Sequence, residues 1–354
     1  MFYLLTSFII SFGLCFALIQ LKHRSFVDAA SGVQKFHDWE VPRVGGVAIF
    51  LALVGVCIVL FIKEKTFSKE FMLIIVSTLP VFLGGVTEDL TKKITPKKRL
   101  ILAFLSGILA CYLVGASLER VGILFVDDIL KAHKLFSVLF TSFALAGVSN
   151  AFNIIDGFNG LASGTGIIVF LSYAYVSFVL GDHLLLYLNL SIFAALVGFF
   201  FWNFPYGKIF LGDGGAYTVG FLAGLSGVLL INKHVQVSPW FPLLLNMYPV
   251  WETIFSIYRR KTTGDSPFDA DACHFHTLIY KRLVKQRFKN TDKKIRNSLT
   301  SPYIWALQMI STIPALLFWK NTPLLILFCL TFIIVYVWLY MRILRFKIPD
   351  FLRV

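Results

Sequence analysis

The chain has 354 residues, of which 57% are hydrophobic and 15% are charged, and its mean hydropathy is +0.77. This composition excludes an ordinary soluble domain and is typical of a membrane protein. The net charge of +14 could suggest a nucleic-acid partner. In a membrane protein, however, basic residues usually gather in the cytoplasmic loops, so we expect no nucleic acid. The five cysteines form no paired pattern and are interpreted as reduced thiols.

Apolar runs of about 18 to 22 residues, the length that crosses ~30 Å of hydrocarbon, recur along the whole chain. The runs at 135–153 and 237–257 are the least regular, because Asn150, Asn246 and Pro249 interrupt them. We predict an all-α, polytopic integral membrane protein with about 11 transmembrane helices in one domain, residues 1–354. The expected spans are 1–20, 45–62, 71–87, 100–117, 135–153, 161–180, 184–202, 214–231, 237–257, 303–319 and 322–341.

The lysines and arginines divide unequally between the two sets of alternate loops. One set holds 25 of them and the other holds 8. Basic loops stay in the cytoplasm, so we predict an extracytoplasmic N-terminus and a cytoplasmic C-terminus. The longest basic segment, 258–302, becomes a cytoplasmic loop. Its run from Lys281 to Arg296 is interpreted as an inside-positive anchor that also attracts lipid headgroups.

Polar residues collect at the cytoplasmic ends of separate spans. Four acids and two histidines from different spans at one membrane face predict the rim of a single site. In chain order, the polar groups are Glu88 and Asp89 after the third span, Asn150, Asn153 and Asp156 at the end of the fifth, Asp213 at the start of the eighth, and His274 and His276 in the 258–302 loop.

Asp213 lies in "IFLGDGGAY", and two interpretations of it are open. A lone acid before a helix is often an N-cap. Three neighbouring glycines, Gly212, Gly214 and Gly215, instead let the backbone approach a phosphate or a metal at a helix N-terminus. The second interpretation predicts a ligand-binding residue.

The other polar residues also have simpler explanations. The segment "TEDLTKK" could be a solvated charge cluster, and Asn150 and Asn153 could bond neighbouring helices. His274 and His276 are weak candidates for metal ligands and better candidates for donors to phosphate. Acids suited to Mg²⁺ (or Mn²⁺), glycines that admit phosphate, and access from the bilayer together favour phosphoryl transfer between a nucleotide and a lipid.

The chain resembles the polyprenyl-phosphate N-acetylhexosamine-1-phosphate transferases, a family of glycosyltransferase family 4 type. Five blocks carry the resemblance, in the same order as in the family and across nearly the whole chain. They are "PRVGGVAIF" from Pro42, "EDLTKK" from Glu88, "NAFNIIDGFNGLASG" from Asn150, "FLGDGGAYTVGF" from Phe210 and "DACHFHT" from Asp271.

The resemblance implies a Mg²⁺-dependent phosphoglycosyltransferase in a bacterial cytoplasmic (inner) membrane, with its active site facing the cytoplasm. UDP-N-acetylhexosamine and undecaprenyl phosphate would give undecaprenyl-diphospho-aminosugar and UMP. This would be the first membrane step of O-antigen, lipopolysaccharide or other surface polysaccharide synthesis. Membrane lipids and a possible homodimer are the other expected partners.

The resemblance also implies roles for individual residues. Asp213 would hold the metal, with Asp89 as a second ligand. Glu88 and Asp89 would lie beside the lipid phosphate, and Lys92 would neutralise phosphate charge. The catalytic set would therefore be Glu88, Asp89, Asp156 and Asp213.

Substrate binding is implied for a further set. Asn153 and Asp156 would position the nucleotide sugar, and His274 and His276 would face the diphosphate or the sugar. The remaining expected substrate contacts are Arg43 and Asn150 from the first and third blocks, and Asn203 and Phe210 at a uridine pocket.

The sequence departs from the family pattern at four positions. Glu88 replaces an Asp, Asn159 replaces the second Asp of the D-G-x-D-G block, and Ala272 and Thr277 replace an Arg and a His. The altered histidine loop favours a polysaccharide-initiating enzyme over a phospho-N-acetylmuramoyl-pentapeptide transferase. A transporter or an inert scaffold with the same fold is the alternative to an enzyme.

Overall fold

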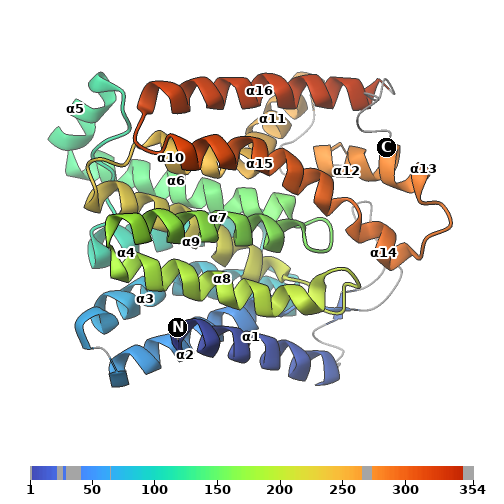
Figure 1. Ribbon diagram of the computed structural model, residues 1–354, viewed down its shortest axis with the longest axis horizontal. Helices are drawn as coiled ribbons and strands as arrows, with labels where there is room; N and C mark the ends of the chain where they lie inside the picture. Colours follow the sequence, from blue (N-terminus) through green and yellow to red (C-terminus); the bar gives the residue numbers. More distant parts are fainter. Residues whose placement is uncertain (1, 22–26, 29–40, 64, 265–272, 346–354) are drawn as a thin grey trace.

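The computed structural model describes residues 2–21, 27–28, 41–63, 65–264 and 273–345, and these residues are almost entirely helical (Figure 1). A two-stranded antiparallel sheet pairs Val27 with Pro42. The elements are α1 (Phe2–Leu21), β1 (Val27–Asp28), β2 (Val41–Pro42), α2 (Gly45–Lys63), α3 (Lys65–Thr91), α4 (Pro96–Val114), α5 (Leu124–Ala132), α6 (Lys134–Ile155), α7 (Leu161–Leu180), α8 (His183–Asn203), α9 (Gly212–Lys233), α10 (Trp240–Leu245), α11 (Met247–Thr263), α12 (Phe275–Ile279), η2 (Tyr280–Val284), α13 (Lys285–Arg287), α14 (Lys293–Ser298), α15 (Ser301–Leu317) and α16 (Thr322–Leu344).

Each of the eleven predicted spans coincides with helical structure. Eight helices in the described part of the chain are long and apolar enough to cross a membrane: α1, α2, α3, α6, α7, α8, α9 and α16. The chain is therefore a multi-pass membrane protein. The number of eleven crossings remains a prediction, because it also requires α4, α15 and the pair α10–α11 to cross.

The ninth predicted span is broken into two helices at Asn246. Pro242 and Pro249 flank this residue, and each lacks the backbone N–H that a continuous helix would use. The Asn246 amide donates to the Tyr173 hydroxyl at 3.0 Å and to the Pro242 carbonyl at 2.9 Å. These bonds satisfy polar groups at the break, so the polar interruption marks the boundary between α10 and α11.

The predicted loop 258–302 is largely helical where it is described. It contains the end of α11, then α12, η2, α13 and α14, while residues 265–272 lie outside the described residues. The sequence analysis did not predict α5, a short helix between α4 and α6. Its Asp127 carboxylate accepts the backbone N–H of Val121 at 2.6 Å and so ties the start of α5 to the preceding turn.

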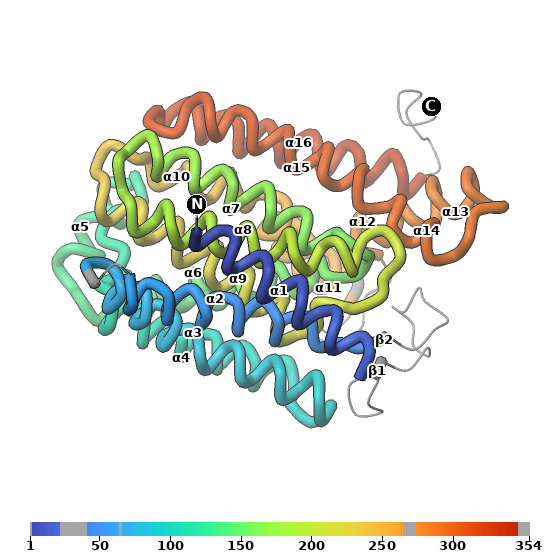
Figure 2. Tube along the Cα trace, turned by 60° about the horizontal axis from the view of Figure 1, so that its bottom comes forward, coloured from blue at the N-terminus to red at the C-terminus, as the bar shows by residue number. Residues whose placement is uncertain are grey.

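Helix α9 lies at the centre of the bundle, and 94% of its membrane-length window is buried inside the protein. It packs against α2, α3, α6 and α7. Helices α1 and α16 lie at opposite edges in Figure 1, and in Figure 2 α4 lies at the edge opposite α16. Glycines bring the start of α9 against α2 and α3. A Cβ atom added to Gly46 would lie 2.1 Å from the Gly215 nitrogen, and one added to Gly85 would lie 2.5 Å from the Gly214 Cα atom.

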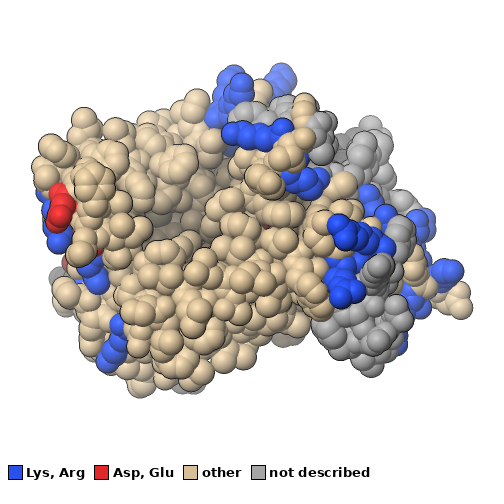
Figure 3. Space-filling model, turned by 90° about the horizontal axis from the view of Figure 1, so that it is seen from above, with Lys and Arg blue, Asp and Glu red and all other residues tan. Residues whose placement is uncertain are grey.

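Basic side chains gather at one end of the bundle, the end that carries α12, α13 and α14 (Figure 3). The C-terminal ends of α3, α6 and α11 and the N-terminal ends of α2, α4 and α9 reach this same end. The sequence prediction assigns it to the cytoplasm.

The orientation can be tested with single cysteines in a background that lacks the five native ones. We expect Lys285→Cys to be protected from an impermeant thiol reagent in spheroplasts, because α13 lies at the basic end. Glu119→Cys should be labelled, because residue 119 lies at the opposite end, between α4 and α5. Labelling of both variants before permeabilisation would contradict the predicted topology.

Candidate active site

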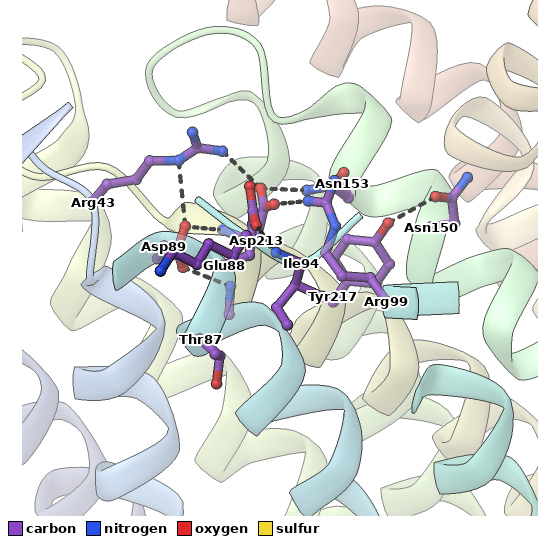
Figure 4. Close-up of polar contacts among 12 residues, drawn as sticks. Arg43, Thr87, Glu88, Asp89, Ile94, Arg99, Asn150, Asn153, Asp213 and Tyr217 are labelled. Carbon is purple, nitrogen blue, oxygen red and sulfur yellow. Dashed lines mark hydrogen bonds and ion pairs between the residues drawn. The ribbon is translucent and has the colours of Figure 1, made fainter. Parts of the chain in front are cut away.

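Asp213 lies in the first turn of α9 and is 3% exposed. Its carboxylate accepts hydrogen bonds from Arg43 Nη2 at 2.7 Å and from Asn153 Nδ2 at 3.0 Å, and it forms an ion pair with Arg99 (Figure 4). These three partners come from the segment before α2, from α6 and from α4. Asp213 thus joins four separate parts of the chain.

Asp89, near the end of α3, takes the capping role that the sequence analysis had considered for Asp213. Its two carboxylate oxygens accept the backbone N–H groups of Asp213 and Gly214, each at 2.8 Å. These N–H groups lie at the start of α9, where a helix has unpaired donors and a positive dipole end. The N-cap interpretation of Asp213 is therefore wrong, because its side chain turns to Arg43, Arg99 and Asn153 instead.

The two carboxylates and the two guanidinium groups balance in charge. Arg43 contacts both acids, since its Nε atom also lies 3.4 Å from Asp89 Oδ1. Arg99 adds the second positive charge at Asp213. Burying an acid costs less when donors and counter-ions surround it, so the two guanidinium groups offset the cost of burying the two carboxylates at this position.

Asn150 is linked to Asp213 through Tyr217 and Arg99. Its Oδ1 atom accepts the Tyr217 hydroxyl at 2.9 Å, and the Arg99 guanidinium lies 5.5 Å from the centre of the Tyr217 ring. Asn150 therefore bonds α6 to α9, as the simpler interpretation had allowed. By holding Tyr217 it also supports the position of Arg99.

Glu88 and Lys92 shape the turn that connects α3 to α4. Glu88 Oε2 accepts the backbone N–H of Ile94 at 2.7 Å, and the Lys92 backbone N–H donates to the Glu88 carbonyl at 2.8 Å. Lys92 has a φ of 57°, in the left-handed region that non-glycine residues seldom adopt. This sharp turn starts α4 beside the site, which brings Arg99 to Asp213. Contact of Glu88 or Lys92 with a lipid phosphate remains a prediction.

Asn203 and Phe210 lie where the segment after α8 approaches the site. Asn203 Oδ1 accepts the Gly160 N–H at 2.6 Å, and its Nδ2 donates to the Ile209 carbonyl at 2.8 Å. Phe210 donates its backbone N–H to the Pro42 carbonyl at 2.9 Å. Both ends of the Asn203 amide thus connect chain segments, and the role of Asn203 and Phe210 in a uridine pocket remains a prediction.

His274 and His276 reach the turn that follows α6. A Cβ atom added to Gly157 would lie 3.2 Å from His276 Nε2, so this histidine packs directly beside the residue after Asp156. The two imidazole rings are 5.2 Å apart between centres. His276 therefore packs against the 156–160 turn, and contact of either histidine with a substrate remains a prediction. Asp271 and Ala272 lie outside the described residues, and Thr277 is buried in α12.

Asp156 follows the last residue of α6 and is half-buried. Burial raises the pKa of its carboxyl from 3.8 to about 7, and the Arg43 guanidinium opposes part of that rise. The folded protein therefore binds a proton at Asp156 more tightly than the unfolded chain does. Its contribution to stability is lost as the pH rises from about 4 to about 7.

We expect Asp156→Asn to gain thermal stability relative to the wild type as the pH rises from 5 to 8, because the variant has no carboxyl to ionise. Thermal unfolding in detergent micelles, followed by intrinsic fluorescence, measures the difference in Tm at each pH. Asp128→Asn, which changes an exposed acid in α5, is the control and should show a constant difference. A constant difference for Asp156→Asn as well would contradict the raised pKa.

Asn159, where relatives of the predicted family carry Asp, belongs to a buried amide network. Its backbone N–H donates to Asn297 Oδ1 at 2.9 Å, and its side-chain Nδ2 donates to Ser298 Oγ at 3.2 Å and to the Pro205 carbonyl at 3.4 Å. A carboxylate has no proton to donate to that carbonyl. In this chain the neutral amide joins the 156–160 turn to α14.

We predict that Asn159→Asp lowers the free energy of unfolding by about 1 to 3 kcal/mol, the scale of one unsatisfied buried polar group. Urea unfolding in mixed micelles measures the change. Asn321→Asp is a matched control, because Asn321 caps α16 through its Oδ1 atom and Asp caps helices equally well. Equal stability of both variants would mean that the amide network does not depend on its donors.

Three residues near the site were missed by sequence reasoning. Arg99 was interpreted only as part of the basic charge of the cytoplasmic loops, although its place directly before the fourth predicted span, close to Glu88 and Asp89 in the sequence, was a usable signal. Tyr217 and Glu252 lie inside apolar segments, and their spacing gave no sign of a shared site.

Comparison with known proteins identifies the class of this chain. The model of the family described as "Glycosyl transferase family 4" matches residues 71–231. This match spans α3, α4, α6 and α9, which supply Asp89, Arg99, Asn153 and Asp213.

Relatives with two different names match over most of their length. A phospho-N-acetylmuramoyl-pentapeptide-transferase of Lactobacillus gasseri is 30% identical over 284 residues, 76% of this chain and 86% of the relative. An undecaprenyl-phosphate alpha-N-acetylglucosaminyl 1-phosphate transferase of Thermotoga maritima is 28% identical over 278 residues, 78% and 81%. A probable undecaprenyl-phosphate N-acetylglucosaminyl 1-phosphate transferase of Bacillus subtilis is 28% identical over 244 residues, 69% and 66%.

The chain belongs to glycosyl transferase family 4, as the five sequence blocks had predicted. Relatives of both kinds match at similar identity. The preference for the polysaccharide-initiating branch therefore remains a prediction.

Proposed function

We propose that this protein transfers an N-acetylaminosugar-1-phosphate from a UDP-sugar to undecaprenyl phosphate, giving undecaprenyl-diphospho-aminosugar and UMP. The observation that carries the proposal is the buried Asp213 carboxylate at the start of α9, held between Arg43 and Arg99. Two guanidinium groups beside one carboxylate suit a diphosphate, because guanidinium groups form charge-assisted hydrogen bonds with phosphate oxygens. The names of the relatives supply the acceptor and the type of sugar phosphate.

The proposed cofactor is Mg²⁺ (or Mn²⁺), with Asp213 as its main ligand and Asp89 as a second one. Carboxylate oxygens are suitable ligands for either ion. Among the described residues, no group of three or more His, Cys, Asp and Glu lies close enough to hold a metal ion. The residues therefore fit a metal whose coordination is completed by phosphate oxygens and water, as is usual for Mg²⁺ at phosphate sites. Bound there, the ion would neutralise charge on the diphosphate.

The reaction needs positioning more than proton transfer. A phosphate monoester has its second pKa near ~6, so most of the lipid phosphate is already a dianion at neutral pH. An oxygen of that phosphate attacks the phosphorus that carries the sugar, and the bond from this phosphorus to the bridging oxygen of UMP breaks. Arg43 and Arg99 are placed to hold the diphosphate in line, and Asn153 and Asp156 to orient the sugar phosphate.

The acceptor would approach from the bilayer at the turn between α3 and α4. Glu88 and Lys92 lie on this turn, and Lys92 is exposed. We propose that the lysine neutralises charge on the lipid phosphate while Glu88 keeps the turn in shape. His276 packs beside Gly157 in the 156–160 turn, and we propose that the histidine pair contacts the diphosphate or the sugar.

A transporter is less well supported than an enzyme. Transporter sites lie near the middle of the bilayer, whereas Asp89, Asp213 and Asp156 lie at the ends of α3, α9 and α6. We further propose that the protein acts in a bacterial inner membrane with this site in the cytoplasm. A polysaccharide pathway and a homodimer belong to the same proposal.

Asp213→Asn should lower Mg²⁺-dependent UMP release by on the order of 10² or more, the scale of losing a group aimed at developing charge. Purified protein, undecaprenyl phosphate and a panel of UDP-aminosugars provide the assay. Asp128→Asn is the control, because Asp128 is exposed at the other end of the bundle. Full turnover by Asp213→Asn at the same Mg²⁺ concentration would overturn the assignment of the metal ligand. No UMP release by the wild type across the panel would contradict the proposed function.

A further inference from the structure

Another buried acid, Glu252, contacts His274 of the histidine pair. Glu252 is in the middle of α11 and is 0% exposed. Its Oε2 atom accepts the Tyr336 hydroxyl at 2.7 Å, and its Oε1 atom accepts the Phe275 backbone N–H at 3.1 Å. His274 Nδ1 also lies 2.9 Å from Oε1. This carboxylate thus joins α11 and α16 to the start of α12.

These contacts favour one tautomer of His274, whose Nδ1 atom also lies 3.1 Å from the Ser256 hydroxyl. An ionised carboxylate can only accept hydrogen bonds, so the nitrogen that faces Glu252 must be a donor. The facing atom is Nδ1, and in a neutral imidazole the other nitrogen, Nε2, is then the acceptor. Three donors around one buried carboxylate favour its ionised form.

The arrangement leads from Glu252 to the proposed active site. The His274 ring is stacked on the His276 ring, with 5.2 Å between centres and 13° between planes. His276 Nδ1 lies 3.3 Å from the Tyr248 hydroxyl, and its Nε2 faces Gly157. Glu252, His274 and His276 therefore form a row that ends at the turn containing Asp156.

We propose that Glu252 is a positioning residue for the transfer reaction. It holds His274 in the Nδ1–H tautomer, so that Nε2 of the neutral ring is the atom that can accept a hydrogen bond from the substrate. This role rests on the proposed function, because it acts on a histidine expected to meet the substrate. Carboxylates that orient a functional histidine in this way typically change activity by 10- to 100-fold when removed.

The alternative is that Glu252 only fastens α12 to α11 and α16. A double-mutant cycle separates the two roles. Glu252→Gln keeps the size of the side chain but loses the charge, so we expect kcat to fall by about 10- to 100-fold, with KM for the UDP-sugar within about 3-fold. In a His274→Ala background the same change should alter kcat by less than about 2-fold, because the residue it acts through is absent. An equal loss in both backgrounds would overturn the proposal.

Glu70→Gln is the matched control, because Glu70 is an exposed acid that pairs with Lys233 at the other end of the bundle. It should leave kcat unchanged.

A second measurement needs neither activity nor a variant at Glu252. In ¹⁵N-histidine-labelled wild type, with the His274 signal assigned by its loss in His274→Ala, NMR should find Nδ1 protonated and Nε2 as the acceptor. The opposite tautomer would overturn the proposal, and because this readout needs no turnover, it stands apart from a failure of the transferase assay.

Discussion

The contact between Asp89 and the start of α9 determines the geometry of the site. The carboxylate of one helix end accepts two N–H groups of another, each at 2.8 Å, in a region where water is largely excluded. Such groups are costly to bury without partners, so the contact fixes α3 and α9 relative to one another. The glycines at 46 and 85 make it possible, because side chains there would meet the backbone of α9. Asp213 faces the site because Asp89 has already satisfied the helix start.

At the centre of the site, the carboxylates of Asp89 and Asp213 are already matched by two guanidinium groups. A metal ion that bound before the diphosphate would have to displace a guanidinium group from Asp213. A metal that arrives with a diphosphate brings the anion to which the arginines can turn. Under the proposed function, these buried charges would favour joint binding of cation and phosphate over binding of either one separately.

The sequence predicted the helices well because the bilayer requires long apolar segments with satisfied backbones. It predicted that Asp89, Asn153, Asp156 and Asp213 share one rim, because each lies at the same end of a span. It did not predict that Asp89 caps α9, since a cap provided by a distant helix leaves no local pattern. Arg99 was missed for a related reason. In a basic loop, the sequence does not distinguish an arginine that keeps the loop in the cytoplasm from one that belongs to a site.

The amides were hardest to interpret from the sequence, because an Asn can bind a ligand or a backbone equally well. Asn153 contacts Asp213, but Asn203 and Asn159 connect chain segments around the 156–160 turn. Asp156 lies at one end of this turn. Asn159, and Gly160 with its hydrogen bond to Asn203, lie at the other end. An acid at 159 would place a second carboxyl on a turn that already holds the half-buried carboxyl of Asp156, whose pKa burial raises to about 7. The neutral Asn159 therefore lets α14 pack against the turn without adding negative charge where a diphosphate is expected to bind.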